Sequence, residues 1–270
     1  MPRVPTDAAC LALLLAAAAG SAGAQQSGII PPGEETLKLS LGGILYRSDT
    51  RLRIDGARVD REFTLEDTLG LDPDRSSVYG EAVWRFASRH RLGLRTFRVK
   101  RDSERPINET IQIADTDIPV NTVLRADSKT TFLLADYRYS FMKTNRMELA
   151  GIAGVFGGRY EFRFNATNPS VDVERKVTAP VPVIGVSLDY FIAPRWTASA
   201  FVQGMSLDFG SVDARVLNLG ASTEYMLTRN FGLGLALSSN SVKLELDKSN
   251  SHGRIGYRAN TLMGYAQVRF

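Results

Sequence analysis

Apolar and polar residues alternate along most of the chain with a period of two. Residues 37–41 alternate leucine with lysine or serine, and residues 262–270 keep every second position apolar or small up to Phe270. No window carries apolar residues at the spacing of three and four that marks an amphipathic helix. Because successive side chains of a strand point to opposite faces, the pattern predicts an all-β chain.

The alternation predicts the positions of individual strands. It is clearest in the segments 37–41, 78–86, 131–141, 184–190, 196–203, 217–227, 231–238 and 261–270. Two further strands are predicted over 91–100 and 147–164, where the apolar positions change phase after Leu94 and near Gly157-Gly158. We expect a β-bulge at the two glycines, since an extra residue in one strand would shift the phase.

The connections between these strands alternate in length. Short polar turns are predicted at 87–90, 142–145, 193–195 and 228–230, and longer polar stretches at 49–75, 101–128, 165–179 and 247–254; the connection at 209–212 is short on the long-loop side. Short turns at one end and long loops at the other are typical of a transmembrane β-barrel. We predict an antiparallel up-and-down barrel of ten strands, or of eight if the first and last hairpins are assigned differently.

Aromatic residues gather beside the short turns, on the apolar faces of the strands. They are Trp84, Phe86, Tyr139, Phe141, Tyr190, Trp196, Tyr225 and Phe231. The core of a soluble sandwich would scatter aromatic rings, whereas a barrel concentrates them where the membrane meets water. We therefore predict a periplasmic aromatic girdle.

Average composition hides this pattern. The 270 residues are 44% hydrophobic and 23% charged, with a net charge of +4 and a mean hydropathy of −0.12. No stretch reaches the roughly 18 apolar residues of a membrane-spanning helix. A barrel produces such averages because its polar positions cancel its apolar ones. The charges are too balanced and too scattered to indicate nucleic-acid binding.

Residues 1–24 have the features of a secretory signal peptide. Arg3 supplies a positive charge, residues 8–19 form an apolar run, and Ala22-Gly23-Ala24 is the small-x-small pattern that signal peptidase cleaves. Cleavage before Gln25 would remove the single cysteine, Cys10, and with it any thiol or disulfide chemistry. We expect residues 25–35 to form a short periplasmic segment and residues 36–270 to form the barrel.

The end of the chain carries a resemblance to a known class. A terminal phenylalanine, Phe270, closes an alternating strand and resembles the signal read by the barrel-assembly machinery. Segments 66–72 and 84–86 are similar to segments of poorly characterised proteobacterial barrels. The chain thus resembles a small Gram-negative outer-membrane β-barrel of the OmpA/OmpW-like, porin-type kind. The resemblance implies an integral outer-membrane location but no activity.

We expect the partners of such a barrel to be lipids and assembly factors. They would be outer-membrane lipids and lipopolysaccharide in the membrane, and the assembly machinery and periplasmic chaperones during biogenesis. We expect no nucleic-acid partner.

The known enzymatic barrels provide tests that this sequence does not meet. An omptin-like protease needs an Asp-x-His pair at the outer rim, but His90 falls in a predicted periplasmic turn and His252 follows Asn250-Ser251. A lipid A deacylase-like site needs His-x-Ser-Asn, and a phospholipase-like site needs His, Ser and Asn on the outer wall. Residues 238–240 offer Ser-Ser-Asn with no adjacent histidine. We interpret both histidines as solvated loop residues and expect no catalytic residue.

Acidic residues cluster in two of the predicted loops. They are Glu66, Asp67, Asp72 and Asp74 in the first, and Asp115 and Asp117 in the second. Carboxylates can bind Ca²⁺, but the spacing of a calcium loop is absent. We expect solvated carboxylates that meet the divalent ions bridging lipopolysaccharide, and no resident metal or cofactor.

The polar faces of the strands carry charges of both signs that would point into the lumen. They are Glu81, Arg85, Arg95, Asp136, Arg138, Glu148, Asp189, Glu224 and Arg269. Unpaired buried charges are costly, so we expect these side chains to pair across a narrow lumen. This favours a plugged, non-enzymatic barrel with a structural or surface-interaction role.

Alternatives to the plugged barrel stay open from the sequence. Small lumen residues such as Gly185, Ser187 and Gly232 keep a narrow porin-like channel for small solutes as the second hypothesis. An outer-membrane lipid or peptide hydrolase is the third. A soluble periplasmic β-protein is the alternative at the level of the fold.

Overall fold

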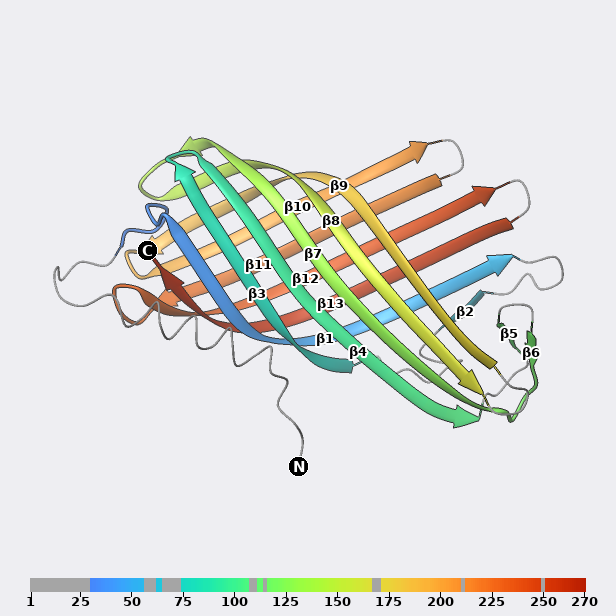
Figure 1. The fold of residues 1–270 in the computed structure, drawn as a ribbon. Coiled ribbons are helices and arrows are strands. Elements are labelled where there is room, and N and C mark those ends of the chain that lie inside the picture. The colour runs from blue at the N-terminus through green and yellow to red at the C-terminus, as the bar shows by residue number, and fades with distance from the viewer. Residues whose placement is uncertain are drawn as a thin grey trace, which may run out of the picture.

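Ten long strands form one closed antiparallel barrel, as the alternation predicts (Figure 1). The computed structural model describes residues 30–55, 62–64, 74–106, 111–113, 116–166, 171–209, 212–248 and 251–270. The long strands are β1 (Leu37–Asp55), β3 (Asp74–Ala87), β4 (His90–Pro106), β7 (Val123–Lys143), β8 (Met147–Ala166), β9 (Val171–Ala193), β10 (Trp196–Phe209), β11 (Val212–Met226), β12 (Phe231–Lys248) and β13 (Ser251–Arg269). Each pairs with its neighbour along the chain, and β13 pairs with β1.

Three short strands lie away from the C-terminal end of the barrel. β2 (Glu62–Thr64) pairs with β1, and β5 (Ile111–Ile113) forms a separate hairpin with β6 (Thr116–Ile118) at the far end (Figure 1). Within the described ranges, no helix is long and apolar enough to cross a membrane.

The first and last strands close the barrel. Their register runs from Lys38 opposite Arg269 to Asp55 opposite His252. The Phe270 N–H donates to the Leu37 carbonyl at 2.8 Å, and the Phe270 carbonyl accepts from Thr36 N at 2.6 Å. Closure pairs both edges of every long strand near the short turns, where an open edge in lipid would leave backbone groups without water to bind. Farther along, residues 98–106 of β4 pair only with β7, and residues 171–183 of β9 pair only with β8.

The predicted turns and loops differ in how well they match the structure. All four short turns join neighbouring strands, and they lie at the end of the barrel that holds the C-terminus (Figure 1). The long loops predicted at 101–128, 165–179 and 247–254 are wrong in extent, because strands run through most of them. The long strands have 14 to 23 residues, whereas about 9–11 suffice to cross a membrane. Farther from the short turns the outward side chains become polar, as at Arg98 and Lys100, so the alternation fades while the hydrogen-bonded ladder continues.

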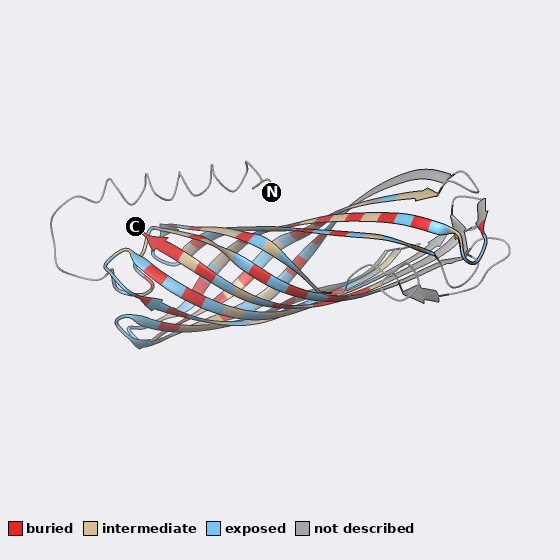
Figure 2. Ribbon diagram, turned by 90° about the horizontal axis from the view of Figure 1, so that it is seen from below, coloured by how far each residue is buried: buried red, intermediate tan, exposed pale blue. Residues whose placement is uncertain are grey.

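Polarity inverts along the barrel. Near the short turns, large apolar side chains such as Leu92, Leu133 and Leu235 point outward and are exposed. Farther along the same strands, inward apolar side chains such as Phe132 and Val183 are buried. Buried and exposed bands alternate along each strand in Figure 2, so the backbone keeps its phase while the polarity of each face changes.

This inversion corrects two predictions from the sequence. In β4, Phe97 and Val99 point inward in phase with Arg95, so no slip follows Leu94. In β8 the pairing runs unbroken through Gly157-Gly158 on both sides, so the predicted bulge is wrong. Register shifts occur instead close to three short turns, at Arg85/Ala87, Ser140/Met142 and Trp196/Thr197.

Candidate functional site

The charged residues predicted to face the lumen all lie on inward positions of their strands, toward the short-turn end. Each forms an ion pair with a side chain from another inward position. They form three neighbouring groups, which we call together the lumen charge network.

The first group surrounds Glu148 of β8. Its two carboxylate oxygens accept from Nη1 and Nη2 of Arg85, each at 2.9 Å, and Arg91 Nη2 lies 3.4 Å away. The Ser140 hydroxyl also donates to this carboxylate. Because Glu148 is fully buried, the two-point contact with a guanidinium offsets the loss of its hydration.

The second group surrounds Glu224 of β11. It accepts from Lys38 Nζ at 3.0 Å, from Arg269 Nη2 at 2.7 Å and from the Tyr265 hydroxyl at 2.9 Å. These donors come from β1 and β13. The group therefore ties the closing pair of strands to β11, which lies beyond β12 in the wall.

The third group surrounds Arg95 of β4. Its guanidinium lies 3.0 Å from Glu81 and 3.4 Å from Asp136, and Arg138 pairs with the same aspartate. Arg95 also lies over the ring of Phe201, with 5.4 Å to the ring centroid. Strands β3, β4, β7 and β10 thus meet through a single side chain.

Lys38 and Arg91 belong to this network but were not predicted to. Arg91 binds Asp189 at 2.8 Å as well as Glu148, and Lys38 binds Glu224. The alternation could have assigned both side chains to the lumen. Lys38 lies between Leu37 and Leu39, and Arg91 directly precedes the outward Leu92.

The short segment before β1 covers the short-turn mouth of the lumen. Gly33 is buried with a φ of +82°, and its N–H donates to Glu35 at 2.8 Å. Its carbonyl accepts from Lys143 Nζ at 2.8 Å. Burial and, next, the positive charge of Arg85 lower the pKa of Lys143 below its usual range. We call residues 31–35 the mouth segment.

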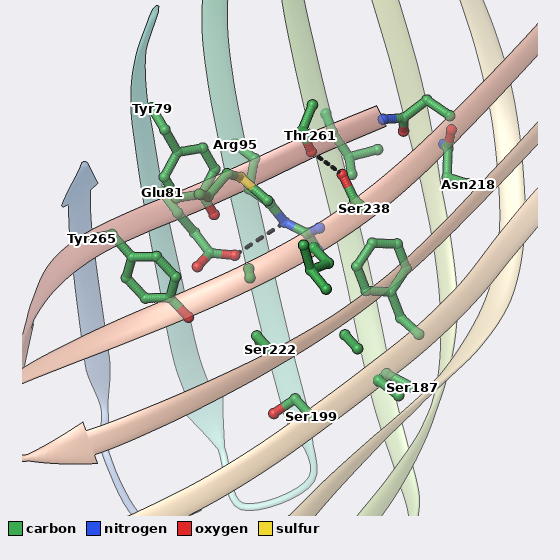
Figure 3. Close-up of a pocket in the computed structure, with 18 of the residues that line it drawn as sticks. Tyr79, Glu81, Arg95, Ser187, Ser199, Asn218, Ser222, Ser238, Thr261 and Tyr265 are labelled. Atoms are coloured by element: carbon green, nitrogen blue, oxygen red, sulfur yellow. Dashed lines mark hydrogen bonds and ion pairs between the residues drawn. The ribbon is translucent and has the colours of Figure 1, made fainter. Parts of the chain in front are cut away.

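A cavity of about 140 Å³ lies in the lumen (Figure 3). One wall carries small polar side chains from β9 to β13, among them Ser187, Ser199 and Ser222, and the facing wall carries Tyr79 and Arg95. The small polar part of the wall comes from inward serines of β9, β10 and β11, whereas β3 and β4 contribute the long side chains of Tyr79 and Arg95.

Several polar atoms in the cavity wall have no hydrogen-bond partner among the described residues. They are the Ser187 hydroxyl, Asn218 Oδ1 and both amide atoms of Gln203, in side chains that are almost entirely buried. Buried polar groups are normally satisfied, and a cavity of this size can hold water. The wall chemistry therefore suits a hydrated space.

A partition separates this cavity from a smaller one of about 40 Å³ behind the mouth segment. Lys38, Arg138, Asp189, Ser199 and Glu224 line both cavities. The ion pairs of the second group thus stand between the middle of the lumen and the mouth.

An apolar cluster closes the other side of the cavity, away from the short turns. Phe132 is its centre, with ring centroids 4.6 Å from Phe97, 5.8 Å from Phe156 and 5.8 Å from Tyr257. Phe132 is buried, and Val183 joins the same cluster. We call this cluster the apolar lid, since it fills the lumen on the side of the charges that lies away from the short turns.

The residues of the predicted girdle point outward at the short-turn end. Each of Trp84, Phe86, Tyr139, Phe141, Tyr190, Trp196, Tyr225 and Phe231 is exposed on the outer face. Some contact each other or a neighbouring strand, as when Trp196 Nε1 donates to the Thr223 hydroxyl at 2.6 Å.

His90 joins this ring, which corrects its interpretation as a solvated loop residue. The turn holds only Ser88 and Arg89, so His90 already begins β4. Its ring lies 5.6 Å from Phe86 and 5.2 Å from Tyr139, and its Nδ1 is 2.6 Å from the Tyr137 hydroxyl.

Some predicted features fall outside the described part of the chain. They are residues 1–24, the segment 66–72 and the side chains of Asp74, Asp115, Asp117 and His252. Among the described residues, no three His, Cys, Asp or Glu side chains are grouped to hold a metal ion.

No protein-family model and no curated protein sequence matches the chain. Among solved structures it is similar to the outer membrane protease OmpT from Escherichia coli, with a TM-score of 0.52 and 11% identity over 93% of this chain and 100% of that chain. It is also similar to Ail, the attachment invasion locus protein of Yersinia pestis (TM-score 0.34, 14% identity, 87% and 99% covered), and to the toluene transporter TodX of P. putida (TM-score 0.36, 8% identity, 90% and 93% covered). At 11% identity the likeness to OmpT concerns the fold alone, and it shows that this chain has the closed antiparallel barrel of outer-membrane proteins.

Proposed function

We propose that this protein is an exported, integral outer-membrane barrel with a closed lumen, and that it acts through its exposed surface. The outward apolar belt and the aromatic ring at its edge support a membrane position, since a soluble protein rarely exposes so continuous an apolar surface. The barrel fold supports the outer membrane. The signal-like residues 1–24 support export.

The lumen charge network is the observation that carries the closed lumen. Opposite charges from β1, β3, β4, β7, β8, β9, β11 and β13 meet inside the barrel, and the mouth segment and the apolar lid lie on either side. Removing one partner of such a buried pair typically costs about 3–5 kcal/mol, so the pairs resist separation. Permeation would require several of them to separate together.

A narrow channel for small solutes is the second candidate. It is favoured by the central cavity and the unpartnered polar atoms of Ser187, Gln203 and Asn218 in its wall. Hydration of this space would provide one section of a water path. The path would still need to pass both the partition and the apolar lid.

The lumen chemistry supports a role other than catalysis. Glu148, Glu224 and Asp136 are each held by cationic side chains, an arrangement suited to stable pairing rather than to a carboxylate that exchanges protons. OmpT is a protease, so hydrolysis deserves a direct test. Peptide or lipid hydrolysis by the purified barrel that is abolished by His252→Ala would overturn the non-enzymatic proposal.

The strand extensions beyond the apolar belt are the part we propose for surface interaction. β7, β8 and β9 continue far past the belt, and the β5–β6 hairpin lies at this end (Figure 1). A rigid, hydrogen-bonded extension holds loops in fixed positions, which favours specific contacts.

Solute flux into liposomes tests the closed lumen. Proteoliposomes containing the refolded barrel would be diluted into iso-osmotic solutions of small sugars and followed by light scattering. We expect swelling no faster than that of protein-free liposomes. Swelling whose rate falls with sugar size would overturn the closed lumen and establish the channel.

A further inference from the structure

A row of amide side chains crosses the inner wall of the barrel beside the cavity. Gln203 of β10 lies directly opposite Asn218 of β11, and Asn218 lies directly opposite Asn240 of β12. All three line the cavity, where Asn218 is seen in Figure 3. Directly opposed side chains on one face of a sheet have Cβ atoms about 4.5–5.5 Å apart, so the amides form one polar strip. We call Gln203, Asn218 and Asn240 the amide row.

The amide row offers hydrogen-bonding atoms that no described residue uses. Gln203 is 1% exposed and Asn218 is 2% exposed, yet both amide atoms of Gln203 and the Oδ1 atom of Asn218 have no partner among the described residues. The buried hydroxyl of Ser187, on the neighbouring β9, also has none within that part of the chain. Buried polar groups are normally satisfied, because an unpaired one has lost its hydration for nothing. These atoms include donors and acceptors, which indicates a polar molecule as their partner.

The charged side chains around the cavity do not call for a charged ligand. Every one of them already belongs to an ion pair; they are Lys38, Glu81, Arg95, Arg138, Asp189 and Glu224. A charged ligand would lose its hydration and meet no uncompensated charge of the opposite sign, which is costly. The hydrogen-bonding capacity that the wall has left is neutral, so the ligand should be uncharged.

The size of the cavity and its apolar part narrow the choice of ligand. Its volume of about 140 Å³ is close to the roughly 150 Å³ of a cavity that holds benzene. Phe132, Phe156 and Leu134 also line it, so a ligand needs C–H groups as well as polar atoms. A short polyol meets both conditions, because its hydroxyl groups donate and accept hydrogen bonds while its carbon chain packs against the rings.

The wall of the barrel loses its backbone hydrogen bonds beside the amide row. The β9–β10 ladder stops at the pair formed by Ile184 and Gly204. Even-numbered residues of β9 turn their N–H groups toward β10, because the N–H of Phe191 donates toward β8. Pro180 and Pro182 therefore stand where β9 would donate to β10, and proline has no N–H to donate. A ligand that enters beside these prolines breaks no ladder hydrogen bond and leaves the partition in place.

We propose that the cavity is a binding site for a short, uncharged polyol, which the amide row and the Ser187 hydroxyl hold. The proposal goes beyond the closed lumen, because the ligand binds on the lid side of the partition and does not pass to the mouth. Solute flux through the barrel and binding within it can therefore fail independently.

Saturation-transfer NMR on the full barrel in deuterated detergent micelles provides the direct test. The probes are erythritol, the charged molecule glycerate and the larger ring polyol inositol. We expect a saturable signal for erythritol, and an apparent affinity at least about tenfold weaker for glycerate and for inositol. An erythritol signal that does not saturate, or equal binding of glycerate or inositol, would overturn the proposal.

Matched substitutions locate the site. Gln203→Leu and Asn218→Leu each remove unpartnered amide atoms and should weaken erythritol binding at least about tenfold. The control Asn260→Leu makes the same change at an exposed position of β13 and should bind within about twofold of the wild type. An equal loss in the control, or no loss in either lumen variant, would overturn the assignment.

Thermal unfolding separates a loss of binding from a loss of folding. Without erythritol, Gln203→Leu and Asn218→Leu should unfold at the same or a higher temperature than the wild type, because each removes buried polar atoms that lack a partner. With erythritol, the wild type and Asn260→Leu should gain stability beyond the general effect of an osmolyte, and the two lumen variants should not. Earlier unfolding of both lumen variants without erythritol, or equal gains in all four proteins, would contradict the proposal.

Discussion

Arg85 and Glu148 form a two-point ion pair inside the barrel, with both N–O distances at 2.9 Å. They lie 63 residues apart in sequence, on β3 and β8. The contact joins two strands that are separated in the wall by β4 and β7. It also lies behind the mouth segment, whose Glu35 is 3.9 Å from the same arginine. Stability and closure of the lumen therefore depend on the same side chains.

Neutralising Glu148 should destabilise the barrel strongly. Glu148→Gln leaves Arg85 and Arg91 without their shared carboxylate in a buried site, and we expect a loss of about 3–5 kcal/mol. The control Asp213→Asn removes the partner of the exposed Arg215 and should cost less than about 1 kcal/mol. Urea unfolding, followed by heat-modifiable gel migration, measures both. Equal small losses would show that the lumen pairs contribute little.

The mouth segment should depend on glycine at position 33. A Cβ there would lie 2.9 Å from Cζ of Phe191 and 3.2 Å from the Glu148 carboxylate, and φ is +82°. Gly33→Ala should therefore release the segment, because alanine rarely adopts this backbone conformation. Protease cleavage near residue 33 should become faster.

Gly43 provides a control for that substitution. A Cβ at Gly43 would meet nothing nearer than the Ser77 carbonyl at 4.0 Å, so Gly43→Ala should leave cleavage at the mouth unchanged. If Gly33→Ala is cleaved no faster than Gly43→Ala, the segment does not depend on the fit described here.

Charged substitutions along β12 should reveal which part of the barrel lies in the membrane. Leu235 is exposed in the middle of the apolar belt, and Ser241 lies on the same face beyond it. Leu235→Arg should cost about 2–4 kcal/mol in a bilayer, whereas Ser241→Arg should cost about 0–1 kcal/mol. Folding titrations into phosphatidylcholine vesicles measure both costs. A larger cost for Ser241→Arg than for Leu235→Arg would contradict a membrane centred on the apolar belt.

Alternation was sufficient to predict the strands and their inward charges. Glu81, Arg85 and Glu224 could be assigned to the lumen because their neighbours on either side are apolar or small and face outward. The partners were not predictable, because the pairing of Glu224 with Lys38 depends on the closure of β13 onto β1. Closure brings together residues that are distant in sequence.

The errors came from treating apolar as outward along the whole strand. Phe97 and Phe156 are apolar and inward, because they pack in the apolar cluster that fills this part of the barrel. A change in the phase of polarity therefore marked the start of this inward apolar cluster rather than a bulge. The predicted loop 165–179 was too long for a related reason. Strands β8 and β9 continue into it although the apolar alternation has ended there.

The apolar lid should contribute to stability as a packed core does. Phe132→Ala removes a buried ring that contacts Phe97, Phe156 and Tyr257, and we expect a loss of about 3–5 kcal/mol. Leu133→Ala, on the outward face of the same strand, should cost less because lipid or detergent replaces its contacts. Similar costs would argue against a packed lid.

Ion conductance across planar bilayers tests the closed lumen most directly. The wild type would be compared with K38S/E224S/F132A, which replaces two partition residues and the centre of the lid with small side chains. Heat-modifiable migration would verify that both samples are folded. We predict no discrete openings for the wild type and discrete openings for the variant. Openings in the wild type at the amplitude of the variant would contradict the account.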